Sequence, residues 1–126
     1  MSSGTIIVVD DEDMTRNLMA SLLRKAGYTV FPARSGEECL QVLATVKPNA
    51  VLMDIKMTGL TGVEVCLRIR NSPPTQYVPV IFVTAHANRG VIEEIRHIPN
   101  THVIAKPFLP ESFLDKFRKC LLAARG

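Results

Sequence analysis

Acidic, hydroxyl and basic residues follow four separate apolar runs of this sequence. Asp10 and Asp11 follow the first of these runs, and Asp54 follows another. Thr84 comes directly after a third run, and Lys106 after a fourth. If the runs are parallel strands of a sheet covered by helices, their carboxyl ends meet at one edge, where such sheets bind ligands. We therefore expect these five side chains to share one site.

These residue types favour phosphoryl chemistry assisted by a metal ion. Carboxylates brought together repel one another unless a cation lies between them, and an all-oxygen ligand set suits Mg²⁺ or Mn²⁺. Lys106 supplies an ammonium group, and Thr84 a hydroxyl group, for the oxygens of a phosphoryl group. Asp54 stands alone in the middle of the expected edge, so it is the best candidate for a nucleophile that forms an acyl phosphate. Asp10 and Asp11 are better suited to hold the metal.

Short apolar runs alternate with helical patterns along the chain. The runs predict five strands, at residues 5–9, 28–33, 50–53, 78–83 and 101–105. Five helices alternating with them predict an α/β fold with a parallel sheet. Because the runs are continuously apolar, we expect helices on both faces. The flavodoxin-like, doubly wound sheet with strand order 2-1-3-4-5 meets these conditions. We expect one domain at residues 1–126, with its core at about 5–122.

Several residues predict where the helices begin and end. Ser35 and Glu38 have the spacing of a capping box, and Gly27 suits the position just after a helix. Pro110 suits the first turn of the last helix. In the first helix, apolar residues recur at helical spacing: Met14, Leu18, Leu22 and Ala26, with Leu23 beside them. Two further helices are expected at residues 63–70 and 88–97.

The composition argues against several classes of function. Of the 126 residues, 47% are hydrophobic and 21% charged, and the net charge is +3. The basic residues are scattered, so no nucleic-acid-binding surface is expected. The 3 cysteines lie far apart and outside any CxxC pair, which argues against a zinc site or a disulfide framework. No run reaches the ~20 apolar residues of a membrane span, and the first residues lack the features of a signal peptide. We therefore expect a cytoplasmic protein without a membrane partner.

Four fragments, in order, resemble the receiver domains of bacterial response regulators, the CheY-like family. They are VVDDE, LMDIKM, VTAH and AKPF, and the resemblance covers about residues 5–122. It implies that Asp54 is the phosphoacceptor. It also implies that Asp11 and Asp54 bind Mg²⁺ directly, together with the main-chain carbonyl of Lys56, while Asp10 acts mainly through water. The protein would then be a signalling receiver that catalyses only its own aspartyl phosphorylation and dephosphorylation.

The resemblance also implies how a signal passes. Thr84 and Lys106 would contact the phosphoryl group, and the peptide bond between Lys106 and Pro107 would be cis. The phosphoryl donor would be a sensor histidine kinase or a histidine phosphotransfer protein. The surface of the fourth helix, fifth strand and fifth helix would then change, towards a downstream effector domain, a partner protein or a homodimer.

The sequence departs from the family pattern at two places. Receivers commonly carry an aromatic switch residue three positions before the lysine, and here that position is Val103. The loop that usually reads MPGMDG is here MTGLTG, from Met57 to Gly62. We expect this second change to affect loop stiffness more than chemistry. Lys56 and His86 occupy positions that tune phosphorylation and hydrolysis rates in the family.

Two alternative functions remain open from the sequence. Residues 11–15 match the DxDxT pattern of haloacid-dehalogenase phosphatases, in which Asp11 would be the nucleophile. The chain is short for such an enzyme, and this alternative leaves Asp54 without a role. A flavin-binding module of the same topology is the second alternative. The acidic residues at 10–13 would repel a flavin phosphate, which disfavours it.

Overall fold

The computed structural model describes residues 3–125 of the 126-residue chain, and the expected domain also includes residues 1, 2 and 126, which lie outside them. Its centre is one five-stranded sheet in the order β2-β1-β3-β4-β5. All four strand pairings are parallel. The strands are β1 (Thr5–Val9), β2 (Thr29–Ala33), β3 (Ala50–Met53), β4 (Val80–Thr84) and β5 (Thr101–Ala105). The predicted flavodoxin-like fold and strand order are therefore confirmed.

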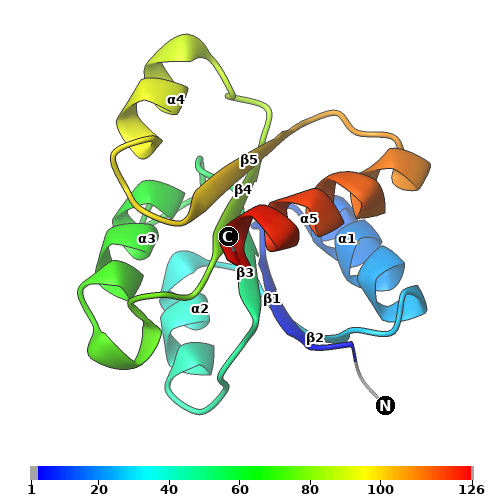
Figure 1. Cartoon of the computed structure of the whole chain (residues 1–126), viewed down its shortest axis with the longest axis horizontal. Coiled ribbons are helices and arrows are strands. Elements are labelled where there is room, and N and C mark those ends of the chain that lie inside the picture. Colours follow the sequence, from blue (N-terminus) through cyan, green and yellow to red (C-terminus); the bar gives the residue numbers. More distant parts are fainter. Residues whose placement is uncertain (1–2, 126) are drawn as a thin grey trace.

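Five α-helices cover the sheet in two layers. They are α1 (Asp13–Lys25), α2 (Gly36–Leu43), α3 (Gly62–Arg70), α4 (Arg89–Ile95) and α5 (Pro110–Arg125). Helices α1 and α5 lie on one face, and α2, α3 and α4 lie on the other (Figure 1). A short 3₁₀ helix, Pro73–Thr75, follows α3. Within the described residues, no helix is both long and apolar enough to cross a bilayer.

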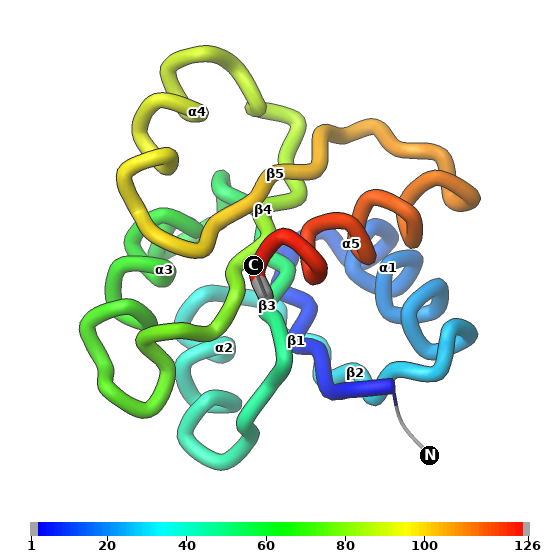
Figure 2. Tube along the Cα trace, in the orientation of Figure 1, coloured from blue at the N-terminus to red at the C-terminus, as the bar shows by residue number. Residues whose placement is uncertain are grey.

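Each face of the sheet has its own apolar core. Side chains alternate between the faces along a strand, so Ile7 and Val9 of β1 pack under α2 and α3, whereas Ile6 and Val8 pack towards α1 and α5. All four are fully buried. Burial on both faces explains why the central strands are continuously apolar, and the Cα trace in Figure 2 shows the strands enclosed between the two helical layers.

The ends of the helices follow local sequence signals. Gly27 has a φ of 98°, a conformation that glycine adopts without steric cost. The N–H of Tyr28 donates to the carbonyl of Leu23, which ends α1 in a Schellman motif. At α2, the Ser35 hydroxyl accepts the N–H of Glu38, as expected for an N-cap. A complete, reciprocal capping box begins α3 instead, between Thr61 and Glu64, which the sequence analysis did not identify.

The structure places the buried face of α1 differently from the apolar row seen in the sequence. Met14 is 83% exposed and Leu18 is 41% exposed. The buried side consists of Met19, Ala20 and Leu23, together with Arg16. The helix itself was predicted, but the row of residues that marked it lies mostly outside the core.

Strand β4 begins at Val80, two residues later than predicted. The N–H of Val78 donates to the carbonyl of Thr75, which completes the turn after the 3₁₀ helix. Pro79 has no N–H to donate to a neighbouring strand. The chain therefore enters the sheet only after this proline.

Helix α4 is tied to its neighbours at its carboxyl end. Within this helix, Ile95 is the residue whose side chain is buried in the core. The Thr101 hydroxyl lies within hydrogen-bonding distance of the carbonyls of Ile95 and Ile98. Arg70 of α3 donates to the carbonyls of Pro99 and Asn100, at 2.8 Å each. These contacts fix the segment that joins α4 to β5.

Candidate functional site

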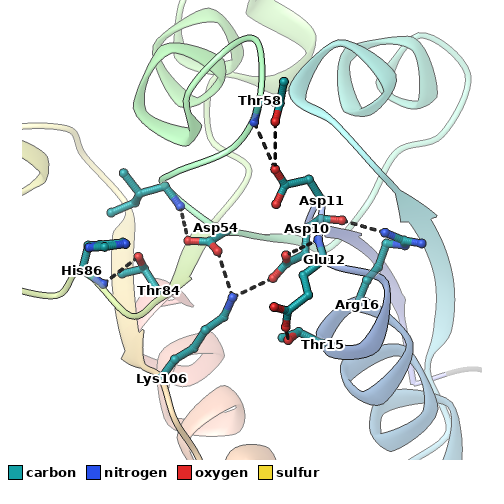
Figure 3. Close-up of polar contacts among 11 residues, drawn as sticks. Asp10, Asp11, Glu12, Thr15, Arg16, Asp54, Thr58, Thr84, His86 and Lys106 are labelled. Carbon is teal, nitrogen blue, oxygen red and sulfur yellow. Dashed lines mark hydrogen bonds and ion pairs between the residues drawn. The ribbon is translucent and has the colours of Figure 1, made fainter.

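Lys106 joins two carboxylates at the carboxyl edge of the sheet (Figure 3). Its Nζ atom lies 2.8 Å from Oδ2 of Asp10 and 2.8 Å from Oδ2 of Asp54. The three residues follow β5, β1 and β3, respectively. The predicted convergence of these distant positions is therefore present in the structure. The Lys106–Pro107 peptide bond is cis, as the family resemblance implied.

Asp10 is a fully buried carboxylate. Its side chain accepts the main-chain N–H of Glu12 at 2.9 Å, in addition to the Lys106 ammonium. Burial nevertheless raises the pKa of Asp10, because desolvation outweighs these two contacts. For Lys106, burial favours the neutral amine, but the hydrogen bonds to both carboxylates prevail and raise its pKa above 10.5. Lys106 is therefore a cation at neutral pH.

The burial of Asp10 predicts a specific dependence of stability on pH. Its pKa in the folded state lies above the ordinary value of 3.8, so folding favours the protonated form. The wild type therefore gains stability from this group as the pH falls, and Asp10→Asn cannot. We expect the Tm of Asp10→Asn, minus that of the wild type, to be more positive at about pH 7 than at about pH 4. Thermal melts in the presence of a metal chelator measure this difference in Tm. A Tm difference that does not change with pH would contradict the prediction.

Asp54 is held by the loop that it begins. Its Oδ1 atom accepts the N–H of Ile55 at 2.7 Å, and its side chain is 13% exposed. The N–H of Gly62 donates to the Ile55 carbonyl at 2.8 Å. A Cβ atom on Gly62 would lie 2.2 Å from the Asp54 carbonyl oxygen. Only glycine therefore lets the start of α3 approach the nucleophile candidate this closely.

Asp11 lies at the same edge but points elsewhere. Its Oδ2 atom accepts the main-chain N–H of Thr58 at 3.1 Å, and the Thr58 hydroxyl lies 3.4 Å from the same oxygen. Among the described residues, no three His, Cys, Asp or Glu side chains are gathered as a metal-binding group. The structure thus joins Asp10 and Asp54 through Lys106, and it directs the Asp11 side chain to Thr58, in the loop after β3.

The donor chemistry of this edge fits a divalent cation. The carboxylates of Asp10, Asp11 and Asp54 are hard oxygen ligands. Lys106 supplies one positive charge against three negative charges, so two formal negative charges remain that this ammonium does not balance. The raised pKa of Asp10 shows that Lys106 alone does not offset the burial of that carboxylate. Lys56 lies in the adjoining loop and is exposed, and the role of its carbonyl as a ligand remains a prediction.

Thr84 and Val103 lie where the sequence placed them, and their predicted roles remain open. Thr84 is fully buried, and its hydroxyl oxygen accepts the N–H of His86 at 3.1 Å. Figure 3 shows this hydroxyl turned towards His86, while Asp54 faces Lys106. Val103 is half-buried and packs against the core under α2, α3 and α4.

Arg16 is a site residue that the sequence analysis missed. It is 6% exposed. Its guanidinium donates to the main-chain carbonyl of Asp10 at 2.8 Å and to the carboxylate of Asp13. It thereby fixes the turn that carries Asp10 and Asp11. The sequence did contain a signal for this role. The spacing of Arg16 from Met19 and Ala20 places this charged residue on the buried face of α1.

Comparisons with known proteins agree on the kind of domain. A family model described as the response regulator receiver domain matches residues 6–118. The polar-differentiation response regulator DivK of Brucella ovis is 30% identical over 117 residues, covering 93% of this chain and 95% of DivK. The structure of the chemotaxis response regulator CheY4 of Vibrio cholerae superposes with a TM-score of 0.87 at 25% identity, covering 95% of this chain and 98% of that one. The receiver domain of a Pseudomonas aeruginosa sensor histidine kinase, solved with a magnesium ion in its active-site cleft, shares the fold at 24% identity, with a TM-score of 0.84 and coverage of 95% and 98%.

Proposed function

Because this chain belongs to the response regulator receiver domain family, we propose that it takes a phosphoryl group onto Asp54. The observation that carries this proposal is the position of Lys106, 2.8 Å from both Asp10 and Asp54. An ammonium beside a carboxylate, both of them partly buried, can stabilise the negative charge of an incoming phosphoryl group. Of the residues in this bridge, Asp54 is the more exposed carboxylate, so it is the one that a phosphoryl donor reaches.

The transfer forms one bond and breaks one. A carboxylate oxygen of Asp54 attacks the phosphorus of a phosphohistidine, and the P–N bond breaks. Its electron pair stays on the imidazole nitrogen, which takes a proton from solvent. Lys106 remains beside the phosphoryl oxygens and balances their charge. The Thr84 hydroxyl turns from the His86 N–H to donate to one of these oxygens.

Asp10, Asp11 and Asp54, with the carbonyl of Lys56, would hold Mg²⁺ or Mn²⁺ in this site. When bound, the ion would neutralise the carboxylates and the phosphoryl oxygens. Arg16 fixes the main chain at Asp10, and with it the turn that carries Asp10 and Asp11.

The partners and the switch follow from this assignment. The donor is a sensor histidine kinase or a histidine phosphotransfer protein in the cytoplasm. The output is a changed surface of α4, β5 and α5, which an effector domain, a partner protein or a second copy recognises. Phosphorylation shifts a pre-existing equilibrium between two conformations. Val103 stands where receivers commonly carry an aromatic switch residue. The side chain at this position in the conformational change is therefore smaller.

Beryllofluoride, a stable mimic of the phosphoryl group, tests the function directly. In the presence of Mg²⁺, we expect it to shift the NMR signals of Asp54, Thr84 and Lys106, and then those of α4. The same titration without Mg²⁺ should leave the spectrum unchanged.

Asp54→Ala is the control, and it should not respond. Failure of the wild type to bind, or undiminished binding by Asp54→Ala, would refute the assignment. The phosphatase alternative is not favoured, because the family match covers nearly the whole chain and Asp11 contacts Thr58 rather than Lys106.

A further inference from the structure

Thr58 holds the side chain of Asp11 in place. The main-chain N–H of Thr58 lies 3.1 Å from Asp11 Oδ2, and its hydroxyl lies 3.4 Å from the same oxygen. Figure 3 shows the Asp11 carboxylate directed towards Thr58, while the carboxylates of Asp10 and Asp54 are directed towards Lys106. The contact joins the loop after β1 to the loop after β3.

The loop that carries Thr58 is itself fixed by its surroundings. The N–H of Leu60 donates to the Glu37 carboxylate of α2 at 3.3 Å. The N–H of Gly62 donates to Ile55, and the close contact at Gly62 leaves no room for a side chain. Asp11, in contrast, is an exposed side chain with rotamers available to it. When the two separate, we therefore expect Asp11 to move and Thr58 to stay.

The residue type at position 58 makes this contact possible. Proline, which stands here in the loop pattern that this chain departs from, has neither an N–H nor a hydroxyl. Threonine supplies both groups to the same carboxylate oxygen. The change from MPGMDG to MTGLTG therefore reaches a residue of the site and is not confined to the stiffness of the loop.

We propose that Thr58 competes with the metal ion for Asp11 and thereby weakens the affinity of this receiver for Mg²⁺. The inference rests on the proposed function, in which Asp11 is a metal ligand. To join Asp10 and Asp54 around a cation, the Asp11 carboxylate gives up the two Thr58 contacts. Their loss subtracts from the binding free energy of the metal. Thr58 acts through Asp11 and touches no reacting atom, so it is a positioning residue.

Titration calorimetry with Mg²⁺ alone measures the effect. We expect Thr58→Pro to bind Mg²⁺ about fivefold more tightly than the wild type, which is the contribution of about one hydrogen bond. Thr58→Ala keeps the N–H and should bind only slightly more tightly than the wild type. Thr45→Ala is the matched control, because Thr45 is also exposed and its hydroxyl lies 3.4 Å from the Val42 carbonyl, away from the site. Its Mg²⁺ affinity should equal that of the wild type.

A double-mutant cycle separates competition from a general change in the loop. If Thr58 acts through Asp11, Thr58→Pro should have no effect on the residual Mg²⁺ affinity of Asp11→Ala, which lacks the acceptor oxygen. At saturating Mg²⁺, Thr58→Pro should accept phosphoryl groups from acetyl phosphate at the wild-type rate. If Thr58→Pro acted only by altering the structure of the loop, it would change both this residual Mg²⁺ affinity and the rate of phosphorylation.

An NMR titration of the wild type provides a test without any variant. The amide signal of Thr58 should shift as Mg²⁺ binds, because the Asp11 acceptor leaves it, whereas the amide of Thr45 should not. An unmoved Thr58 amide, or a folded Thr58→Pro with unchanged or weaker Mg²⁺ affinity, would overturn the inference and leave the proposed function standing. A wild type that binds no Mg²⁺ would instead overturn the proposed function, and this inference with it.

Discussion

Asp54→Asn will lose covalent phosphorylation, with incorporation of label from acetyl [³²P]phosphate at least about 100-fold below the wild type. The amide cannot act as the nucleophile, but it keeps the size of the side chain and an oxygen that can accept the Ile55 N–H. We therefore expect the protein to fold normally, with a circular dichroism spectrum like that of the wild type.

Asp115→Asn, an exposed residue of α5, is the control and should label at the wild-type rate. Reduction of the labelled wild type with borohydride converts an aspartyl phosphate into homoserine, which mass spectrometry locates in the chain. Homoserine at position 11 instead of position 54 would transfer the nucleophile to Asp11 and revive the phosphatase alternative.

Lys106→Met should have the second-largest effect, and it should alter both activity and stability. Methionine keeps most of the apolar stem but removes the ammonium that lies between the two carboxylates. The rate of labelling should fall about 100-fold, which is the usual effect of removing one charge-stabilising donor. Thermal melting followed by tyrosine fluorescence or circular dichroism should also show that the Tm of Lys106→Met at neutral pH is lower than that of the wild type.

The sign of the stability effect follows from the pKa of Lys106. Its folded-state pKa is raised above 10.5, so its stabilising contribution is complete below that pH and is lost only in stronger alkali. The wild type should therefore exceed Lys106→Met in Tm throughout the neutral range. Lys116→Met, on the exposed side of α5, is the matched control. A Lys106→Met protein that labels and melts like the control would remove Lys106 from the site.

The fold was predictable because strand identity depends on short-range patterns. The runs at β1, β3 and β5 are rich in apolar and β-branched residues, and the structure gives them the predicted bounds. Parallel pairing then brings the carboxyl ends of these strands to one edge, so the meeting of Asp10, Asp54 and Lys106 required only the strand order.

The orientation of individual side chains was harder to predict from the sequence. Asp11 is next to Asp10 in sequence, yet it binds Thr58, because the two side chains leave the main chain in different directions. Arg16 was overlooked because a charged residue in an amphipathic helix usually faces solvent, whereas here its guanidinium finds the Asp10 carbonyl. Contacts of this kind depend on tertiary geometry that a sequence pattern does not contain.

The ties at the carboxyl end of α4 determine how that helix can move. Arg70 and Thr101 anchor the segment after Ile95, at the rim opposite the carboxylates. The other end begins at Asn88, whose side chain accepts the Val91 N–H within the first turn of the helix. Any displacement of α4 should therefore be a rotation about its carboxyl end. The movement should be largest beside Thr84 and smallest near Pro99.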